Sequence, residues 1–177
     1  MRQSHDNRPP MSDPLAYFLT WSTYGTWLPG DERGWIEHER GWQPPNPIRK
    51  LEAEAKMAED ACRLDLAQRE VVRQQVTATC EFRRWLLHAV NCRSNHVHVV
   101  VSASQPPKTV RNQLKAWCTR RLKELEQERQ KASGCGSEKI REQWWAERGS
   151  QRFINDEDSL EAAIQYVRDG QDKPRPH

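Results

Sequence analysis

The stretch Asn95-His96-Val97-His98-Val99-Val100-Val101 decides the fold of this chain. Its β-branched residues favour a buried strand over a helix or a loop. Because side chains alternate along a strand, His96 and His98 are expected on one face of a sheet, with Val97 and Val99 on the other. Two imidazoles on one face, roughly 7 Å apart at Cβ, can converge on a divalent metal ion. The alternative is a polar, half-exposed face whose histidines bond to their neighbours, and two histidines alone do not define a metal site.

The composition indicates one polar domain. The chain has 177 residues, of which 30% are charged and 36% hydrophobic, with a net charge of +3. This charge permits nucleic-acid binding without requiring it. The five cysteines are odd in number and contain no C-x-x-C pair, which argues against a disulfide framework and predicts reduced thiols, mostly in the core. No signal peptide, membrane-spanning run or lipidation motif is apparent, so we expect a cytoplasmic protein without a membrane partner.

The pattern of strands and helices predicts an α+β fold. Period-two and helical periodicities indicate strands at 17–24, 86–90, 96–101 and 151–154, and helices at 67–84, 107–126 and 157–169. This order matches a ferredoxin-like βαββαβ antiparallel sheet with an added C-terminal helix, and it makes the histidine strand central. We expect disordered tails at 1–13 and 173–177, a single domain over 14–172, and a mobile link at 127–142.

Residues 28–66 are predicted to form a loop and helical insertion. Positions 28–47 are rich in Gly, Pro and charge, and positions 50–64 are helix-prone. Trp35 lies near Arg33 in this loop, a combination that suits stacking on unpaired bases. Equally, Trp35 and Trp42 could pin the loop to the core.

The predicted helix at 107–126 carries the densest run of positive charge. Between Pro107 and Leu125 a single acid, Glu124, accompanies six cations: Lys108, Arg111, Lys115, Arg120, Arg121 and Lys123. Such a run is either a solvated face or a surface that contacts phosphates.

Tyr166 lies at the edge of the apolar stripe of the last predicted helix, next to Ala162 and Ala163. Taken alone, it is a packing tyrosine. Beside a metal-binding histidine pair, its phenol, of pKa about 10, could attack a phosphodiester whose negative charge a cation withdraws. The phosphotyrosine product would keep the energy of the cleaved bond, so that reversal rejoins strands without ATP.

Together these residues resemble the single-tyrosine HUH transposases, particularly the REP-associated tyrosine transposases. The similarity extends over about residues 14–172 and is carried by the histidine pair, the tyrosine, the strand order and four segments: YFLTWSTYGTWLPG at 17–30, SNHVH at 94–98, WAERGS at 145–150 and AIQYV at 163–167.

The resemblance implies that His96 and His98 bind Mg²⁺ or Mn²⁺ and that Tyr166 is the nucleophile. Cleavage of single-stranded DNA would give a 5′-phosphotyrosine and a free 3′-hydroxyl. The family's third polar ligand stands four residues after the tyrosine, where this chain has Gly170, so we assign that role to Gln171, with Gln165 and Asp169 as alternatives. The DNA contacts are expected from six side chains: Lys108, Arg111, Lys115, Arg120, Arg33 and Trp35.

The implied function is cleavage and rejoining of hairpin DNA during DNA transposition, by a protein that is nucleoid-associated when bound to DNA. Two alternatives stay open: a domesticated hairpin-binding protein that does not cut, and a metal hydrolase in which Tyr166 is structural. The sequence does not decide between a monomer and a homodimer.

Overall fold

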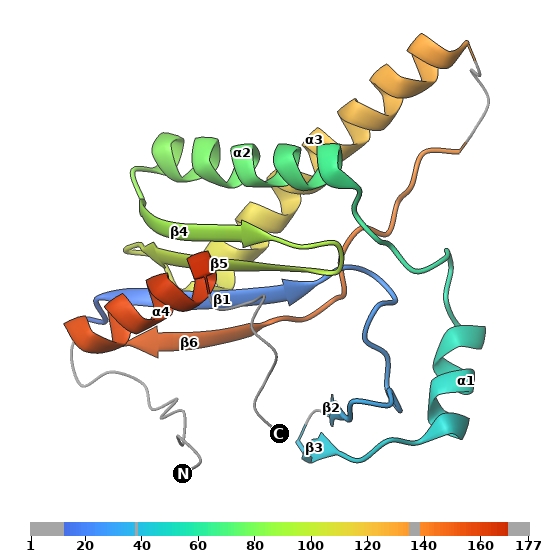
Figure 1. The fold of residues 1–177 in the computed structure, drawn as a ribbon, viewed down its shortest axis with the longest axis horizontal. Helices are drawn as coiled ribbons and strands as arrows, with labels where there is room; N and C mark the ends of the chain where they lie inside the picture. The colour runs from blue at the N-terminus through green and yellow to red at the C-terminus, as the bar shows by residue number, and fades with distance from the viewer. Residues whose placement is uncertain (1–12, 38, 135–138, 170–177) are drawn as a thin grey trace.

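A four-stranded antiparallel sheet forms the centre of the fold. The computed structural model describes residues 13–37, 39–134 and 139–169. The strands follow the order β4–β5–β1–β6, and their bounds are β1 Ala16–Ser22, β4 Leu86–Cys92, β5 His96–Ser102 and β6 Ser150–Ile154. This is the predicted ferredoxin-like arrangement, with the histidine strand β5 inside the sheet between β4 and β1 (Figure 1). The predicted tails lie outside the described residues, apart from Asp13.

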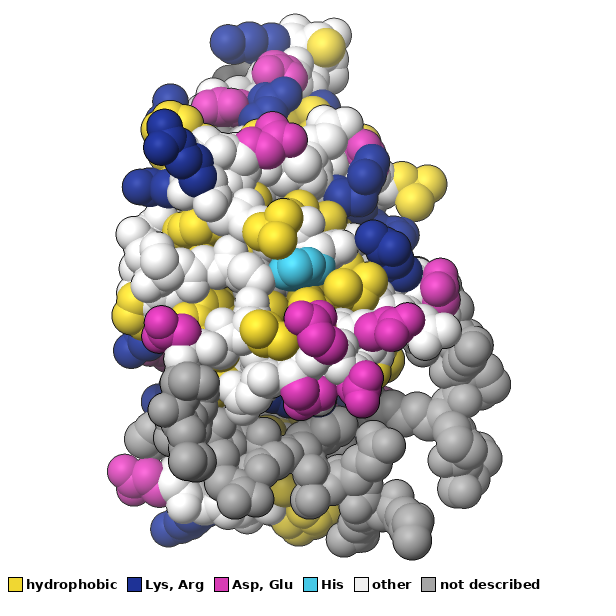
Figure 2. Space-filling model, turned by 90° about the vertical axis from the view of Figure 1, so that its left-hand side faces the viewer, with side chains coloured by type: hydrophobic (Ala, Val, Ile, Leu, Met, Phe, Trp, Pro, Cys, Tyr) yellow, Lys and Arg dark blue, Asp and Glu magenta, His cyan; other side chains and the backbone are white. Residues whose placement is uncertain are grey.

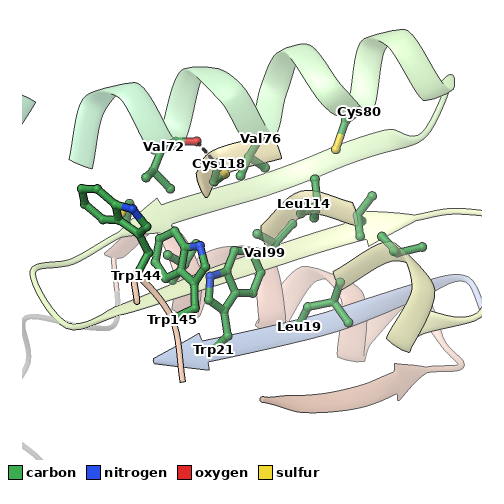
Figure 3. Close-up of a cluster of buried hydrophobic side chains, with 14 of the residues drawn as sticks. Leu19, Trp21, Val72, Val76, Cys80, Val99, Leu114, Cys118, Trp144 and Trp145 are labelled. Carbon is green, nitrogen blue, oxygen red and sulfur yellow. Dashed lines mark hydrogen bonds between the residues drawn. The ribbon is translucent and has the colours of Figure 1, made fainter. Parts of the chain in front are cut away.

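Two helices, α2 (Leu66–Arg83) and α3 (Pro107–Ser133), cover one face of the sheet (Figure 1). Figure 3 shows how their side chains meet those of the strands, with Val76 and Leu114 packed towards Leu19, Trp21 and Val99. All five side chains are at most 1% exposed. The period-two prediction is therefore confirmed on this face, because every second residue of β1 and β5 belongs to one buried cluster.

The opposite face carries α4 (Glu157–Asp169), which lies in front of the sheet in Figure 1. The helix buries few side chains against the sheet: Ala163 and Val167 pack with Ala16, Val100 and Ile154. Figure 2 views the side on which α4 begins, where Asp and Glu side chains gather. Acids in the first turn of α4 suit the helix dipole, but they make this end of α4 unfavourable for a phosphate backbone.

The insertion after β1 folds as a small unit of its own. It contains the hairpin β2 (Trp35–Glu37) and β3 (Gly41–Gln43), followed by α1 (Pro47–Ala55). The helix is shorter than the helix-prone stretch 50–64 suggested. In Figure 1 this unit lies beyond one end of the sheet, away from α4.

Helix α3 is longer than the sequence predicted. It continues through 127–133, which we expected to be a mobile link, and ends where Gly134 adopts φ +69°. Ion pairs hold the extra turns: Arg121 to Glu128 at 3.3 Å, and Arg129 to Asp65 before α2 at 2.7 Å. Helix α3 has 27 residues, but no helix in the described ranges is both long and apolar enough to cross a membrane.

The cysteines agree with the expectation of reduced core thiols. Cys62, Cys80, Cys92 and Cys118 are free and buried, while Cys135 lies outside the described residues. Burial raises the pKa of the Cys80 and Cys92 thiols to about 12, so both are protonated and unreactive at neutral pH.

Candidate functional site

His96 and His98 lie side by side on the face of the sheet that carries α4. The pairing of β5 with β1 places His98 opposite Thr20 and His96 opposite Ser22. The two imidazole centroids are 4.7 Å apart, with the rings inclined at 71°. The expectation that both histidines share one face is confirmed.

Each imidazole has its Nδ1 atom engaged by a neighbouring oxygen. His98 Nδ1 lies 2.7 Å from Thr20 Oγ1, and His96 Nδ1 lies 2.7 Å from Asn95 Oδ1. Because an amide oxygen only accepts, the proton of neutral His96 is on Nδ1 and its lone pair is on Nε2. Metal-binding histidines are commonly oriented in this way, by a bond from the ring nitrogen that does not coordinate.

His98 is held in the neutral form. The side chain is 9% exposed, and this burial lowers the pKa of His98 to about 4, with the neighbouring charges of His96 and Arg93 contributing less. Neutral imidazole is the form that binds a metal ion. The orientation of both rings and the neutral state of His98 fit the pair as ligands of a divalent ion.

Tyr166 of α4 completes an aromatic cluster with the two histidines and Phe18. Its ring centroid is 5.8 Å from that of His98 and 6.0 Å from that of Phe18, and 44% of the residue is exposed. Phe18 also stacks on His98 at 5.4 Å, and the Arg152 guanidinium lies 5.2 Å above the Phe18 ring. We call Phe18, His96, His98 and Tyr166 the aromatic cluster. Phe18 was missed by the sequence analysis, although its place two residues before Thr20 puts it on the same face.

Asn91 of β4 fixes the end of α4 that bears Tyr166. It is opposite His98 in the sheet, and its Nδ2 donates to the carbonyl of Val167 at 2.9 Å. Val167 is itself buried, so the backbone next to Tyr166 is tied to the sheet by packing and by a hydrogen bond. No signal in the sequence marked Asn91.

The third metal ligand stays a prediction. Gln171 lies outside the described residues, and the alternatives Gln165 and Asp169 are exposed on α4. Within the described ranges, no group of three or more His, Cys, Asp and Glu side chains is placed to hold a metal ion. The described part of the chain therefore brings together two imidazoles as candidate metal ligands.

Arg111 and Lys115, predicted to contact DNA, are structural cations. Arg111 is 6% exposed and donates to the Gly149 carbonyl at 2.8 Å, while Lys115 Nζ donates to the carbonyls of Ala146 at 2.7 Å and Glu147 at 3.2 Å. Burial lowers the pKa of both side chains, that of Lys115 to about 8. Both side chains hold the segment that leads into β6, and their contact with DNA stays a prediction.

Lys108 and Arg120 are exposed on α3, where Arg120 pairs with Glu124 at 3.2 Å and lies 5.5 Å above the Trp117 ring. Helix α3 covers the face of the sheet opposite the histidines. Contact of these two cations with DNA stays a prediction, and it would involve a surface remote from the aromatic cluster.

In the insertion, Trp35 is buried inside the small unit and not in the core of the sheet. It is 7% exposed, lies 5.6 Å beneath the Arg49 guanidinium and belongs to neither buried cluster, so its stacking on a base stays a prediction. Arg33 is exposed but bonded to Asp31, with Nε to Oδ1 at 2.6 Å. The exposed indole next to Arg33 is Trp27, which the sequence analysis did not single out.

Comparisons with known proteins find similarity only in three dimensions. No protein-family model matches the chain, and no curated protein matches its sequence. One similar structure is a REP-associated tyrosine transposase bound to a REP hairpin, with a TM-score of 0.48 and 12% identity over 90% of this chain and 68% of that one. Another is a proposed transposase from Deinococcus radiodurans R1, with a TM-score of 0.44 and 13% identity over 93% of this chain and 95% of that one.

Proposed function

We propose that this protein cleaves and rejoins single-stranded hairpin DNA through a 5′-phosphotyrosine formed on Tyr166, with Mg²⁺ or Mn²⁺ bound at His96 and His98. One observation carries the proposal: an exposed tyrosine from α4 packs against a buried, neutral histidine that lies beside a second histidine. A packing tyrosine needs no such partners, whereas phosphoryl transfer needs a nucleophile and a cation site together.

The chemistry assigns each group one task. Tyr166 Oη attacks the phosphorus, the Tyr–O–P bond forms, the P–O3′ bond breaks, and the phenolic proton is balanced by protonation of the leaving 3′-oxygen. Attack by a 3′-hydroxyl reverses these changes and restores Tyr166. A bound divalent ion supplies Lewis-acid stabilisation of charge on the phosphate. Thr20 and Asn95 keep the imidazoles oriented, and Asn91 keeps the tyrosine's helix in place.

The test is a denaturing gel with end-labelled hairpin DNA taken from beside the gene, with Mn²⁺ or with a chelator. We expect a metal-dependent protein–DNA band that resists denaturant and disappears in Tyr166→Phe, because this change removes the nucleophilic oxygen and keeps the ring. Tyr24→Phe is the matched control, since the Tyr24 hydroxyl accepts a hydrogen bond from the Ala58 amide at 2.9 Å and Tyr24 is not part of the aromatic cluster. That variant should form the band normally.

Two outcomes contradict the proposal. A band that persists in Tyr166→Phe would identify another nucleophile. Binding on a native gel without any covalent band in the wild type would favour the non-cleaving hairpin-binding alternative. That alternative stays open because Gly170, at the position of the family's third ligand, has no side chain that could bind a metal.

A further inference from the structure

A pocket of about 680 Å³ opens beside the candidate site, between the insertion and the segment that leads into β6. Its walls come from the end of β1, the loop after it, the β2–β3 hairpin and residues 146–150. The volume lies in the range of pockets that hold small ligands, about 300–1,000 Å³. Neither the histidine pair nor Tyr166 lines this pocket.

The pocket shares a wall with the candidate site. Thr20 and Ser22 line it, and these are the β1 residues opposite His98 and His96. A DNA strand whose phosphate lies at the aromatic cluster would therefore have a neighbouring nucleotide at the mouth of the pocket. This step rests on the proposed function.

Trp27, on the pocket wall, is exposed and yet held in place. It is 48% exposed, its Nε1 donates to the Gly34 carbonyl at 2.8 Å, and the Arg33 guanidinium lies 5.7 Å from its ring centroid. Arg33 is fixed in turn by its bonds to Asp31. A pre-oriented indole loses little conformational entropy when an aromatic ligand stacks on it.

The remaining lining fits a base better than a phosphate. Leu28, Pro29 and Ile36 supply apolar surface, and Glu37 supplies a carboxylate that is held by Arg49 at 3.0 Å. Carboxylates accept hydrogen bonds from the amino groups of bases but repel phosphates. Exposed Arg148, also on the wall, can meet the strand's backbone.

We infer that this pocket binds one unpaired base of the DNA strand, next to the position of cleavage, by stacking it on Trp27. The pocket would then read where along the strand Tyr166 attacks. The occupant is a nucleotide of the substrate strand, and a free nucleotide is expected to bind far more weakly because it lacks the contacts of the flanking strand.

The experiment measures affinity by fluorescence anisotropy, in chelator so that no cleavage occurs. The probe is a labelled DNA hairpin with oligothymidine flanks on both ends, together with a series in which one flank nucleotide at a time is abasic. Stacking of a base is worth roughly 1–3 kcal/mol, so one abasic position should lower affinity about tenfold. Trp27→Ala should lower the affinity for the intact probe by a similar factor. In this variant, the abasic nucleotide at the sensitive position should cause no further loss of affinity.

The controls separate stacking from damage to the insertion. Trp27→Phe keeps an aromatic ring and should retain most of the affinity. Trp117→Ala removes an indole that is 38% exposed on α3, across the sheet, and its effect should not depend on the abasic position. The inference is overturned if Trp27→Ala binds like the wild type, if its loss is the same at every abasic position, or if the wild type binds none of the probes.

Failure of this inference and failure of the proposed function give different results. If a covalent band forms with Mn²⁺ but the effect of Trp27→Ala is the same at every flank position, the base pocket is rejected and strand cleavage is retained. If the effect of Trp27→Ala depends on one flank position but no covalent band forms, the protein binds DNA and reads a base but does not cleave the strand.

Discussion

At the scale of single residues, Thr20 determines how His98 presents its second ring nitrogen. Thr20→Val has nearly the same shape and suits a strand, but it removes the oxygen that lies 2.7 Å from His98 Nδ1. Loss of such an orienting partner typically lowers metal affinity 10–100-fold. We expect that loss in a calorimetric titration with Mn²⁺, with the circular dichroism spectrum unchanged.

Thr77→Val is the matched control, because Thr77 Oγ1 bonds the Arg73 carbonyl on the exposed side of α2. It should bind Mn²⁺ as the wild type does. Equal affinity in Thr20→Val would show that the bond does not orient a ligand, and a wild type that binds no Mn²⁺ would contradict the metal centre itself.

Residue types predicted the candidate centre better than they predicted its surroundings. Alternation along β5 was enough to place His96 and His98 on one face, because strand periodicity is local. The roles of Arg111 and Lys115 depend on carbonyls 38 and 31 residues further along the chain, which only the folded structure brings near. A run of cations in a sequence does not show which of them find internal partners.

At the scale of elements, α4 depends on Asn91 for the position of Tyr166. The helix buries only Ala163 and Val167, so the bond from Asn91 to the Val167 carbonyl is a large share of what holds its last turn. Asn91→Ala should lower the free energy of unfolding by about 1 kcal/mol. It should also slow formation of the covalent adduct roughly tenfold to a hundredfold, since small displacements of a reacting group have effects of that size.

The measurement combines single-turnover adduct formation with amide exchange in α4, which should quicken near Val167. Arg168→Ala serves as control, because Arg168 is exposed and its bond to the His88 carbonyl is long, at 3.3 Å. An equal slowing in both variants would show that α4 as a whole, and not the Asn91 bond, sets the rate.

The elements themselves were largely predictable, and their ends were not. The four sheet strands and α2, α3 and α4 all occur where the periodicity placed them. The sequence missed the last two turns of α3, because ion pairs from Arg121 and Arg129 stabilise a stretch that has the composition of a polar linker. The β2–β3 hairpin was missed because its strands have three residues each, too few for a periodic signal.

At the scale of the whole molecule, one face of the sheet carries the large hydrophobic core and the other carries the candidate site. The face under α2 and α3 buries the large core, including Trp21 and Leu114. The face under α4 buries a small cluster and leaves Tyr166 exposed beside the histidines. Stability and the candidate chemistry are therefore placed on opposite sides of one sheet, so that the second side carries polar side chains outside the large core.

The insertion should be removable without loss of the sheet. Its two ends meet: Met57 Cε occupies the space that a Cβ on Gly25 would need, and the Cys62 amide donates to the Tyr24 carbonyl at 2.8 Å. Among the described residues, neither buried cluster includes a residue from 27–56. A short Gly-Ser linker can therefore replace 27–56 while the core and the aromatic cluster keep their packing.

We expect this deletion variant to unfold cooperatively and to form the Tyr166 adduct with Mn²⁺, because His96, His98 and α4 are untouched. It should lose the dependence of affinity on a single flank base, because Trp27 and the β2–β3 wall of the pocket are gone. Thermal unfolding by circular dichroism and the abasic-probe series measure the two properties separately. A variant that fails to fold would show that the insertion supports the sheet through Trp35 and its neighbours, whereas a folded variant that still reads the flank base would place the base outside the pocket.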